Sequence, residues 1–255
     1  MSERFDLTNR VVIITGAGQG IGRVFAQAFA DAGAIPVIAE LNADAGEAVA
    51  AGIRATGAQA LAVSTDIGDE ESTLALAARV QEQFGRIDVL INNAGIFSTI
   101  TMRPFTEIPL KEWNQVMHVN VTGVFLMTRA VTPSMKSQGF GRIINISSAA
   151  VTMGRPGYLH YIASKSALLG MSRSLAHELG GDGITVNSIL PGATETEIDR
   201  ATVSPEQRVA MLAMRCVSRA ETPEDLVGTA LFLASPDSAF LTGQSLTVDG
   251  GLTHL

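Results

Sequence analysis

Short apolar runs rich in β-branched residues alternate along this chain with longer stretches in which apolar residues recur every three or four positions. The short runs have the length and composition of buried strands, and the longer stretches have the period of helices. We expect strands at 11–15, 35–39, 60–65, 87–91, 142–147, 184–190 and 245–248. We expect helices to cover 24–29, 43–56, 70–84, 103–137, 158–179 and 223–234.

Prolines modify two of these predictions. Pro36 falls in the second apolar run, and we expect it at the beginning of that strand because proline cannot donate a hydrogen bond to a neighbouring strand. Pro104 and Pro109 are expected to break the helical pattern of 103–137 near its start, and Pro133 is expected to end it. Strands that alternate with helices throughout predict an α/β fold with a parallel sheet covered on both faces. No linker or repeat divides the chain, so residues 1–255 are expected to form a single domain.

The turn after the first strand is rich in glycine. Residues 15–22 read T-G-A-G-Q-G-I-G, which differs from G-x-G-x-x-G because position 21 is isoleucine. Glycines allow a backbone to approach a pyrophosphate, whose charge is stabilised at the N-terminus of the following helix. A tight strand-to-helix turn without a ligand is the alternative. The strand before it and the helix after it favour a dinucleotide site.

Glu40 ends the second strand, 20 residues after Gly20. A carboxylate at this position accepts hydrogen bonds from the adenosine ribose and repels a ribose 2′-phosphate. No Arg or Lys stands at 15–22 or 41–42 to attract such a phosphate. We therefore expect NAD rather than NADP as the cofactor. The alternative is that Glu40 is a solvated charge at a strand end.

The stretch from 145 to 165, N-I-S-S-A-A-V-T-M-G-R-P-G-Y-L-H-Y-I-A-S-K, is the candidate centre of chemistry. Tyr161 and Lys165 are four residues apart, so on a helix their side chains share a face. A free phenol has a pKa of about 10, and a neighbouring ammonium lowers it, so Tyr161 could exchange a proton with a substrate oxygen. Ser148, at the end of the strand, could hydrogen-bond the same oxygen. An exposed Tyr–Lys pair with no chemical role is the alternative.

Composition and charge exclude several classes of function. The chain has 255 residues, 46% of them hydrophobic, and carries a net charge of −7 without a cluster of Lys and Arg. Nucleic acids and anionic membranes require a basic face, so neither is an expected partner. No apolar signal core is present at the start, and no apolar run approaches the about 18 residues of a membrane span. The single cysteine, Cys216, fits a reducing cytoplasm, and we expect no metal because no His, Cys and Asp cluster has ligand spacing.

Together these motifs resemble the short-chain dehydrogenase/reductase family, in its branch of about 250 residues. The resemblance covers the whole chain. Within the family, the sequence is similar in character to 3-oxoacyl-carrier-protein reductases and NAD-dependent secondary-alcohol dehydrogenases. It implies a Rossmann-like, doubly wound, seven-stranded parallel sheet in the order 3-2-1-4-5-6-7, with the cofactor at the switch between strands one and four. The motifs that carry it are T-G-A-G-Q-G-I-G, Asp66, N-N-A-G at 92–95, Asn120 in H-V-N-V-T-G, Ser148, Y-I-A-S-K at 161–165 and P-G at 191–192.

The resemblance also implies a role for individual residues. Tyr161 would be the general acid/base, Ser148 would orient the substrate oxygen, and Lys165 would bind the nicotinamide ribose. Asn120 would hold, through its backbone, a water that links Lys165 to solvent. The implied catalytic residues are Asn120, Ser148, Tyr161 and Lys165. The implied cofactor contacts are Gly16, Gln19, Gly20, Ile21, Glu40, Asp66, Ile67, Asn93, Ala94, Gly95, Tyr161, Lys165, Pro191, Gly192 and Thr196. Asn120 could instead be an ordinary helix-interior amide, Asp66 a turn former and Pro191–Gly192 a strand-ending turn.

The expected reaction is reversible hydride transfer between NAD(H) and a secondary alcohol or ketone. An NADPH-dependent 3-oxoacyl-carrier-protein reductase is the alternative enzyme, and a non-catalytic dinucleotide-binding protein is the alternative from another class. Residues 194–219 are expected to cover the substrate. His160 points about 100° away from Tyr161 on the helix, which predicts a surface or cavity-lip position. The resemblance further suggests a homotetramer, assembled through the helices at about 110–135 and 158–179 and the last strand; apolar residues expected to contribute are Phe125, Met127, Leu168, Leu169 and Leu175.

Overall fold

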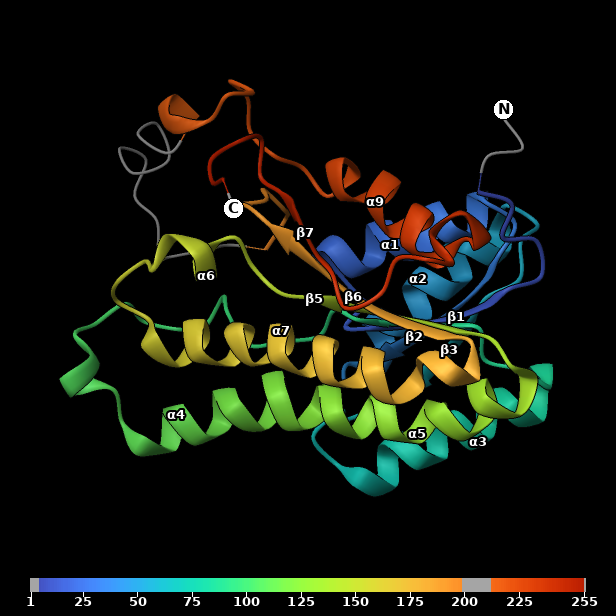
Figure 1. Cartoon of the computed structure of the whole chain (residues 1–255). Coiled ribbons are helices and arrows are strands. Elements are labelled where there is room, and N and C mark those ends of the chain that lie inside the picture. The colour runs from blue at the N-terminus through green and yellow to red at the C-terminus, as the bar shows by residue number, and fades with distance from the viewer. Residues whose placement is uncertain (1–4, 199–211, 255) are drawn as a thin grey trace.

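Seven parallel strands form one sheet in the order β3-β2-β1-β4-β5-β6-β7 in the computed structural model, which describes residues 5–198 and 212–254 (Figure 1). This is the order expected from the sequence. The strands are β1 (Val11–Thr15), β2 (Ile35–Glu40), β3 (Leu61–Ser64), β4 (Val89–Asn92), β5 (Gly141–Ile146), β6 (Ile184–Pro191) and β7 (Ser245–Val248). The main helices are α1 (Gly20–Asp31), α2 (Ala43–Ala55), α3 (Glu70–Phe84), α4 (Leu110–Met117), α5 (Gly123–Gln138), α6 (Ala150–Met153), α7 (Leu159–Leu179) and α9 (Glu224–Ala234).

Helices cover both faces of the sheet, as Figure 1 shows. Val12 and Ile14 of β1 belong to an apolar cluster with α1, α2 and α9. Val11 and Ile13 belong to the cluster on the opposite face, which contains residues of α3, α5 and α7. Every residue of β1 is buried, so the strand reads as a continuous apolar run rather than an alternating one. Each fully buried Val or Ile side chain contributes about 1.5–3 kcal/mol of hydrophobic stabilisation.

The helical pattern of 103–137 is divided differently from the prediction. Leu110–Met117 and Gly123–Gln138 are separate helices joined by a π-helical turn at His118–Thr122. Pro133 lies inside α5 and does not end it, which corrects the sequence prediction. Pro133 is exposed, so the carbonyl of Arg129 that lacks a backbone N–H partner faces the solvent side of the helix and water can satisfy it. Pro36 is the second residue of β2, near its beginning as expected.

Parallel strands place all their carboxyl ends at one edge of the sheet. The glycine turn follows β1, Asp66 follows β3, Asn93 follows β4 and Ser148 follows β5. The sheet order reverses between β1 and β4, and ligands bind at such a switch point in doubly wound folds. Residues separated by more than 100 positions in sequence are therefore gathered in one place.

Buried polar side chains attach α7 to this edge. Asn145 of β5 donates to Ser172 Oγ at 2.8 Å, and Ser172 Oγ lies 2.8 Å from Ser188 Oγ of β6. Ser147 Oγ donates to the Lys165 carbonyl at 2.8 Å. Buried polar groups are costly when unpaired, so a rotation or sliding of α7 would break several bonds at once. These bonds fix the direction in which α7 presents its first turns.

The apolar residues expected to mediate assembly do not all lie on the surface. Met127 and Leu168 are completely buried in the core, whereas Phe125 is 49% exposed. The helical pattern alone could not distinguish the two environments, because α5 and α7 pack against both the sheet and neighbouring helices. Within the described residues, no helix combines the length and the apolarity needed to cross a membrane.

Candidate active site

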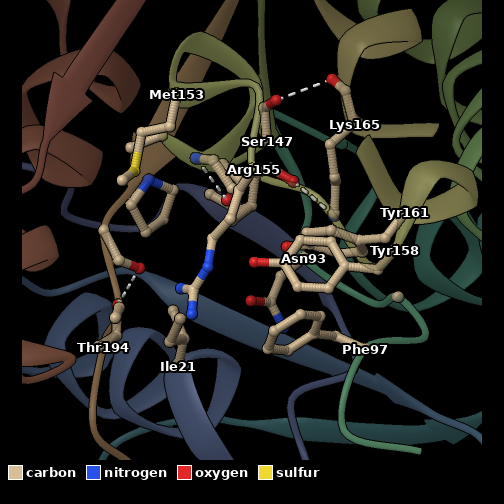
Figure 2. Close-up of a pocket in the computed structure, with 18 of the residues that line it drawn as sticks. Ile21, Asn93, Phe97, Ser147, Met153, Arg155, Tyr158, Tyr161, Lys165 and Thr194 are labelled. Atoms are coloured by element: carbon tan, nitrogen blue, oxygen red, sulfur yellow. Dashed lines mark hydrogen bonds between the residues drawn. The ribbon is translucent and has the colours of Figure 1, made fainter. Parts of the chain in front are cut away.

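Ser148, Tyr161 and Lys165 line one cavity at the carboxyl edge of the sheet. Figure 2 labels Tyr161 and Lys165 in its wall. Tyr161 and Lys165 lie one turn apart on α7, with Lys165 Nζ 6.0 Å from the centre of the Tyr161 ring. Ser148 lies after the end of β5, and its Oγ accepts a hydrogen bond from the Ala150 N–H at 3.2 Å. The structure thus brings together the three polar groups whose spacing suggested acid/base chemistry.

Lys165 is almost completely buried, with 6% of its surface exposed. Its Nζ donates to the Ile146 carbonyl at 2.8 Å. Removal from water disfavours the charged form and lowers the pKa of Lys165 to about 8. The ammonium therefore still predominates at neutral pH, and it places a positive charge 6.0 Å from the centre of the Tyr161 ring.

Asn120 is fully buried in the π-helical turn, and its side chain binds two other segments. Its Oδ1 accepts from the Ile96 N–H at 2.7 Å, and its Nδ2 donates to Ser164 Oγ at 3.1 Å. A side chain added at Gly95 would place its Cβ 3.2 Å from Asn120 Oδ1 and 3.3 Å from Lys165 Nζ. Asn120 therefore connects the loop after β4 to α7 next to Lys165, which is more than an ordinary helix-interior amide does.

A second cavity adjoins the first and extends along the ends of β1, β2 and β3. The two cavities share Ile21, Asn93, Gly95 and Ile96 in their walls. The expected cofactor residues that line the second cavity are Gly16, Gln19, Ile21, Glu40, Asp66, Ile67, Asn93, Ala94, Gly95 and Thr196. Pro191 and Gly192 line the first cavity together with Tyr161 and Lys165. The residues expected to contact a dinucleotide thus border two adjoining cavities. Gly20, at the start of α1, lies beside these cavities.

The glycine turn has the close packing expected of a phosphate-binding turn. A Cβ at Gly22 would lie 2.4 Å from the Gly16 carbonyl oxygen, and Gly20 has a φ of +57°. The Gly20 N–H already binds an anion within the chain, because it donates to Glu197 Oε1 at 2.9 Å. That bond is the main reason why the pKa of Glu197 is lowered. The turn and the N-terminus of α1 therefore fit a negatively charged group, and a dinucleotide bound there would replace the Glu197 carboxylate.

Glu40 faces the glycine turn rather than open solvent. Its Oε2 accepts from the Gly18 N–H at 3.0 Å, and its Oε1 accepts from the Asn42 N–H at 3.1 Å. Each carboxylate oxygen has a second lone pair available for a ribose hydroxyl. No Arg or Lys is among the described residues that line this cavity, whose acidic members are Glu40 and Asp66.

Asp66 and Pro191–Gly192 also make the local hydrogen bonds expected from the alternative interpretations, in which Asp66 is a turn former and Pro191–Gly192 a strand-ending turn. Asp66 Oδ1 accepts from the Gly68 N–H at 2.8 Å, which makes Asp66 a turn former and a cavity residue at once. The Pro191 carbonyl accepts from the Ala149 N–H at 2.8 Å and so joins the ends of β5 and β6. Local hydrogen bonds of this kind hold the backbone in place at the cavity wall.

A buried ion pair behind this wall was not predicted from the sequence. Glu221 Oε1 accepts from the Gly192 N–H at 3.1 Å and from Thr194 Oγ1 at 2.7 Å. Its Oε2 lies 3.3 Å from Arg215 Nη2, and Arg215 also donates to the Ala193 carbonyl at 3.1 Å. Burial raises the pKa of Glu221. The pair fixes the chain after β6. Its members lie 20 to 30 residues from that loop in the sequence, and no periodic pattern connects the two regions, so the sequence alone did not reveal the contact.

Three aromatic rings enclose one side of the first cavity. Phe97 lies 4.6 Å from Tyr161 between ring centres, and Tyr158 lies 5.9 Å from Tyr161 in an edge-to-face arrangement. Burial raises the pKa of the Tyr158 hydroxyl. Tyr158 precedes Tyr161 by three residues, so helical spacing could have identified it. Phe97 belongs to a loop without a repeating pattern and could not have been found in this way.

His160 is fully buried, and its predicted position at the surface or cavity lip is therefore wrong. Its Nε2 lies 2.9 Å from Glu112 Oε1 of α4, which also binds Arg103. The face of α7 that points away from Tyr161 is covered by α4, a tertiary contact that helical geometry alone does not reveal. In the part of the chain that the structure describes, no three His, Cys, Asp or Glu side chains are grouped to hold a metal ion.

Only part of the expected substrate cover at 194–219 lies within the described residues, because 199–211 fall outside them. In the described part, Thr196 and Ile198 line the second cavity, and Thr194 lines the first. Ile198 approaches the glycine turn closely, since a Cβ at Gly20 would lie 3.0 Å from its Cδ1. The beginning of this segment therefore runs beside both cavities.

Known proteins resemble this chain over nearly its full length. Residues 16–253 match the family described as enoyl-(acyl carrier protein) reductase. A 3-oxoacyl-[acyl-carrier-protein] reductase from Synechocystis is 39% identical over 250 residues, which cover 96% of this chain and 98% of the relative.

Two solved structures share the fold closely. A 7α-hydroxysteroid dehydrogenase complexed with NADH and 7-oxo glycochenodeoxycholic acid has a TM-score of 0.92 and 36% identity, covering 98% of both chains. A protein from Beutenbergia cavernae, assigned as an NAD(P)-dependent gluconate 5-dehydrogenase and holding NADP at low occupancy, has a TM-score of 0.90 and 37% identity. The match covers 97% of this chain and 98% of that protein. The chain therefore belongs to the short-chain dehydrogenase/reductase family and is an oxidoreductase that acts on CH–OH and C=O groups.

Proposed function

We propose that this protein transfers a hydride reversibly between NAD(H) and a secondary alcohol or ketone, with Tyr161 as the general acid/base. The observation that supports this most strongly is the shared wall of two cavities. One contains Ser148, Tyr161 and Lys165, and the other contains the glycine turn and Glu40. A dinucleotide that spans both would bring its nicotinamide next to Tyr161. The bound nicotinamide supplies or accepts the hydride.

The protein's own residues move and hold the proton of the reaction. Tyr161 donates its phenolic proton to the carbonyl oxygen during reduction and removes a proton from the hydroxyl during oxidation. The positive charge of Lys165 favours the phenolate and so makes Tyr161 a better base near neutral pH. Ser148 binds the same substrate oxygen and fixes its position. The buried position of these groups strengthens each interaction, because little water screens them.

The remaining site residues hold the cofactor and support Lys165. Lys165 would bind the nicotinamide ribose, and Asn120, held by Ile96 and Ser164, would position a water that connects Lys165 to solvent. The backbone from Gly16 to Ile21 would bind the pyrophosphate. Glu40 would bind the adenosine ribose, and the other contacts are the cavity residues Asp66, Ile67, Asn93, Ala94, Gly95, Pro191, Gly192 and Thr196.

Glu40 supports NAD over NADP. A 2′-phosphate would place about two negative charges beside this carboxylate, and unit charges about 4 Å apart interact by about 4 kcal/mol near a protein surface. An NADPH-dependent 3-oxoacyl-carrier-protein reductase remains the alternative, which the Synechocystis relative favours. A comparison of the two cofactors distinguishes these functions.

The first prediction concerns Tyr161. Tyr161→Phe should lower kcat by 10²- to 10⁴-fold, because a positioned general acid usually contributes that much. The Kd for NADH, measured by fluorescence titration, should remain unchanged because the ring still packs against Phe97. Tyr158→Phe is the matched control, since it removes the other tyrosine hydroxyl in the same cavity and should cost far less. Retention of more than about a hundredth of the wild-type kcat by Tyr161→Phe would show that Tyr161 is not the acid.

The second prediction concerns the energetic cost of Lys165. The folded protein holds this proton more weakly than the unfolded chain, because the pKa falls from 10.5 to about 8. The buried charge of Lys165 therefore lowers the free energy of unfolding by its whole amount below about pH 8. This penalty decreases above that pH and disappears as the pH rises past about 10.5. At about 1.4 kcal/mol per pKa unit, the penalty is about 3 kcal/mol. Lys165→Met should raise Tm at pH 7 by about 3 °C or more while abolishing turnover.

Two comparisons make the Lys165 measurement specific. The gain in Tm should be smaller at pH 10 than at pH 7, since wild-type Lys165 is then largely neutral. Lys136→Met removes an exposed lysine paired with Asp182, and its Tm should change little at either pH. A lower Tm for Lys165→Met at pH 7 would contradict the assigned cost of burial.

The third prediction concerns cofactor choice. Wild-type protein should show at least a 10²-fold higher kcat/KM with NAD than with NADP. Glu40→Ala combined with Leu41→Arg should reduce use of NAD and improve use of NADP, mainly through KM for the cofactor. Leu41 is suitable for the arginine because it is 69% exposed and lines the same cavity.

Glu40 also binds the Gly18 N–H, so its removal disturbs the glycine turn as well as the charge. Glu40→Gln keeps an oxygen acceptor there and removes only the charge, which makes it the control. It should raise the relative use of NADP without a large loss of NADH binding. Two results would show that Glu40 does not select the cofactor through its ribose. One is a wild-type preference for NADP, and the other is a ratio of kcat/KM with NAD to kcat/KM with NADP that does not change in the double variant.

We further infer that residues 1–255 form a single domain in which 194–219 cover the substrate. A cytoplasmic location is supported by the lone, exposed Cys216.

We also infer a homotetramer assembled through α4, α5, α7 and β7. The support is apolar surface on these elements, with Leu110 72%, Phe125 49% and Leu159 46% exposed.

The fourth prediction tests this assembly by sedimentation velocity at micromolar concentration. Wild-type protein should sediment as a tetramer, and Phe125→Glu should shift it to smaller species because a charge would be buried in the contact. Leu74→Glu is the matched control, since Leu74 is also 49% exposed but lies on α3, outside the proposed contacts. A stable wild-type monomer would refute the tetramer.

A further inference from the structure

The cavity that contains Ser148 and Tyr161 also contains Arg155, to which the proposed hydride transfer assigns no role. Arg155 and Lys165 are the charged side chains among the described residues that line this cavity. Lys165 is buried and donates to the Ile146 carbonyl. Arg155 comes from the loop between α6 and α7, and Figure 2 shows its side chain pointing into the cavity.

The loop that carries Arg155 has a defined conformation. Gly154 and Gly157 on either side of it have φ values of +59° and +96°, which other residues rarely adopt. The Arg103 N–H donates to the Gly157 carbonyl at 2.8 Å and attaches the loop to the segment before α4. The Arg155 guanidinium lies 5.9 Å from the centre of the Tyr158 ring, a distance at which a cation is attracted to an aromatic face. The backbone and the aromatic wall therefore direct Arg155 toward the substrate end of the site.

The charge of the cavity differs from that of the whole protein. The chain carries a net charge of −7, which repels anions at long range, whereas the described lining of this cavity has two cations and no carboxylate. Most of the remaining wall is apolar, including Ile96, Phe97, Met153 and Leu252. An apolar wall strengthens an interaction between a guanidinium and an anion because it excludes water. A guanidinium also has five N–H donors, so Arg155 can bind an anion while it keeps another contact.

We propose that Arg155 binds an anionic group of the substrate, a carboxylate or a phosphate, which lies apart from the oxygen held by Ser148 and Tyr161. The enzyme then acts on alcohols and ketones that carry a negative charge, and Arg155 is the residue that selects them. This proposal rests on the proposed function, because it takes Ser148 and Tyr161 as the reacting end of the cavity. The planar guanidinium matches both anions in a two-point contact, which a lysine cannot reproduce.

The test compares matched anionic and neutral ketones as substrates. The carboxylate arm uses 4-oxopentanoate and 5-oxohexanoate against their primary amides, and the phosphate arm uses hydroxyacetone phosphate against hydroxyacetone. Initial rates of NADH oxidation are measured for wild type, Arg155→Ala and Arg155→Lys. In wild type, at least one anionic ketone should have a kcat/KM about 10-fold or more above that of its neutral partner. The arm in which this preference occurs identifies the anion.

The substitutions should act on the anionic substrate alone. Arg155→Ala should raise KM for the preferred anionic ketone by about 10- to 100-fold, as expected for loss of a hydrogen-bonded charge. It should leave kcat/KM for the neutral partner within about threefold, which also shows that the variant is folded. Arg155→Lys should give an intermediate KM. Arg79→Ala, which removes the same charge from the surface of α3 where Arg79 pairs with Glu82, should change neither substrate.

Three outcomes would overturn the proposal while the proposed function still holds. Wild type could use every neutral ketone as well as its anionic partner, or Arg155→Ala could weaken both members of a pair equally. Arg155→Ala could also weaken NADH binding and leave the substrate ratio unchanged, in which case the arginine would serve the cofactor. If wild type reduced no ketone of either kind with NADH or NADPH, the proposed function would fail first and this inference with it.

Discussion

The site depends on the attachment of α7 to the carboxyl edge of the sheet. A helix held only by apolar packing could rotate or slide by a fraction of a turn at modest cost. Here Ser147 holds the backbone of α7 at the Lys165 carbonyl, Asn145 holds Ser172, and Asn120 holds Ser164. Each bond is buried, so its loss would leave a polar group without water or a partner. The first turns of α7 are thereby fixed relative to Ser148 and to the glycine turn.

This attachment permits a feature that is unfavourable for folding. Lys165 is removed from water and is compensated by the Ile146 carbonyl rather than by a carboxylate in the described structure. In the proposed mechanism the positive charge of Lys165 acts on the Tyr161 phenol, and a carboxylate partner would neutralise that charge. The buried cation is consistent with sites in which function is obtained at the expense of stability. Cohesion comes instead from the two apolar layers on the faces of the sheet.

The sequence predicted those features that are local or that follow from the parallel sheet. The glycine turn, Glu40 at the end of β2 and the shared face of Tyr161 and Lys165 could be inferred because spacing and strand ends determine them. The strand order was implied by the resemblance to the short-chain dehydrogenase/reductase family. Features created by contacts between distant segments could not. Glu221 reaches the loop after β6 through a buried pair, Phe97 approaches Tyr161 from an irregular loop, and α4 buries His160. Pro133 is tolerated because its position in α5 faces solvent, and that depends on packing rather than on the residue itself.

We propose that one dinucleotide spans the two cavities and places its nicotinamide beside Tyr161. A crystal structure of the protein with NADH tests this most directly. We expect the pyrophosphate to lie on the backbone at Gly20 and Ile21, with Glu197 displaced. We expect the adenosine ribose hydroxyls to lie within hydrogen-bond distance of Glu40, and the nicotinamide ring to border the space between Ser148 and Tyr161. An NADH molecule bound elsewhere, or with its nicotinamide directed away from Tyr161, would show that this binding mode is wrong.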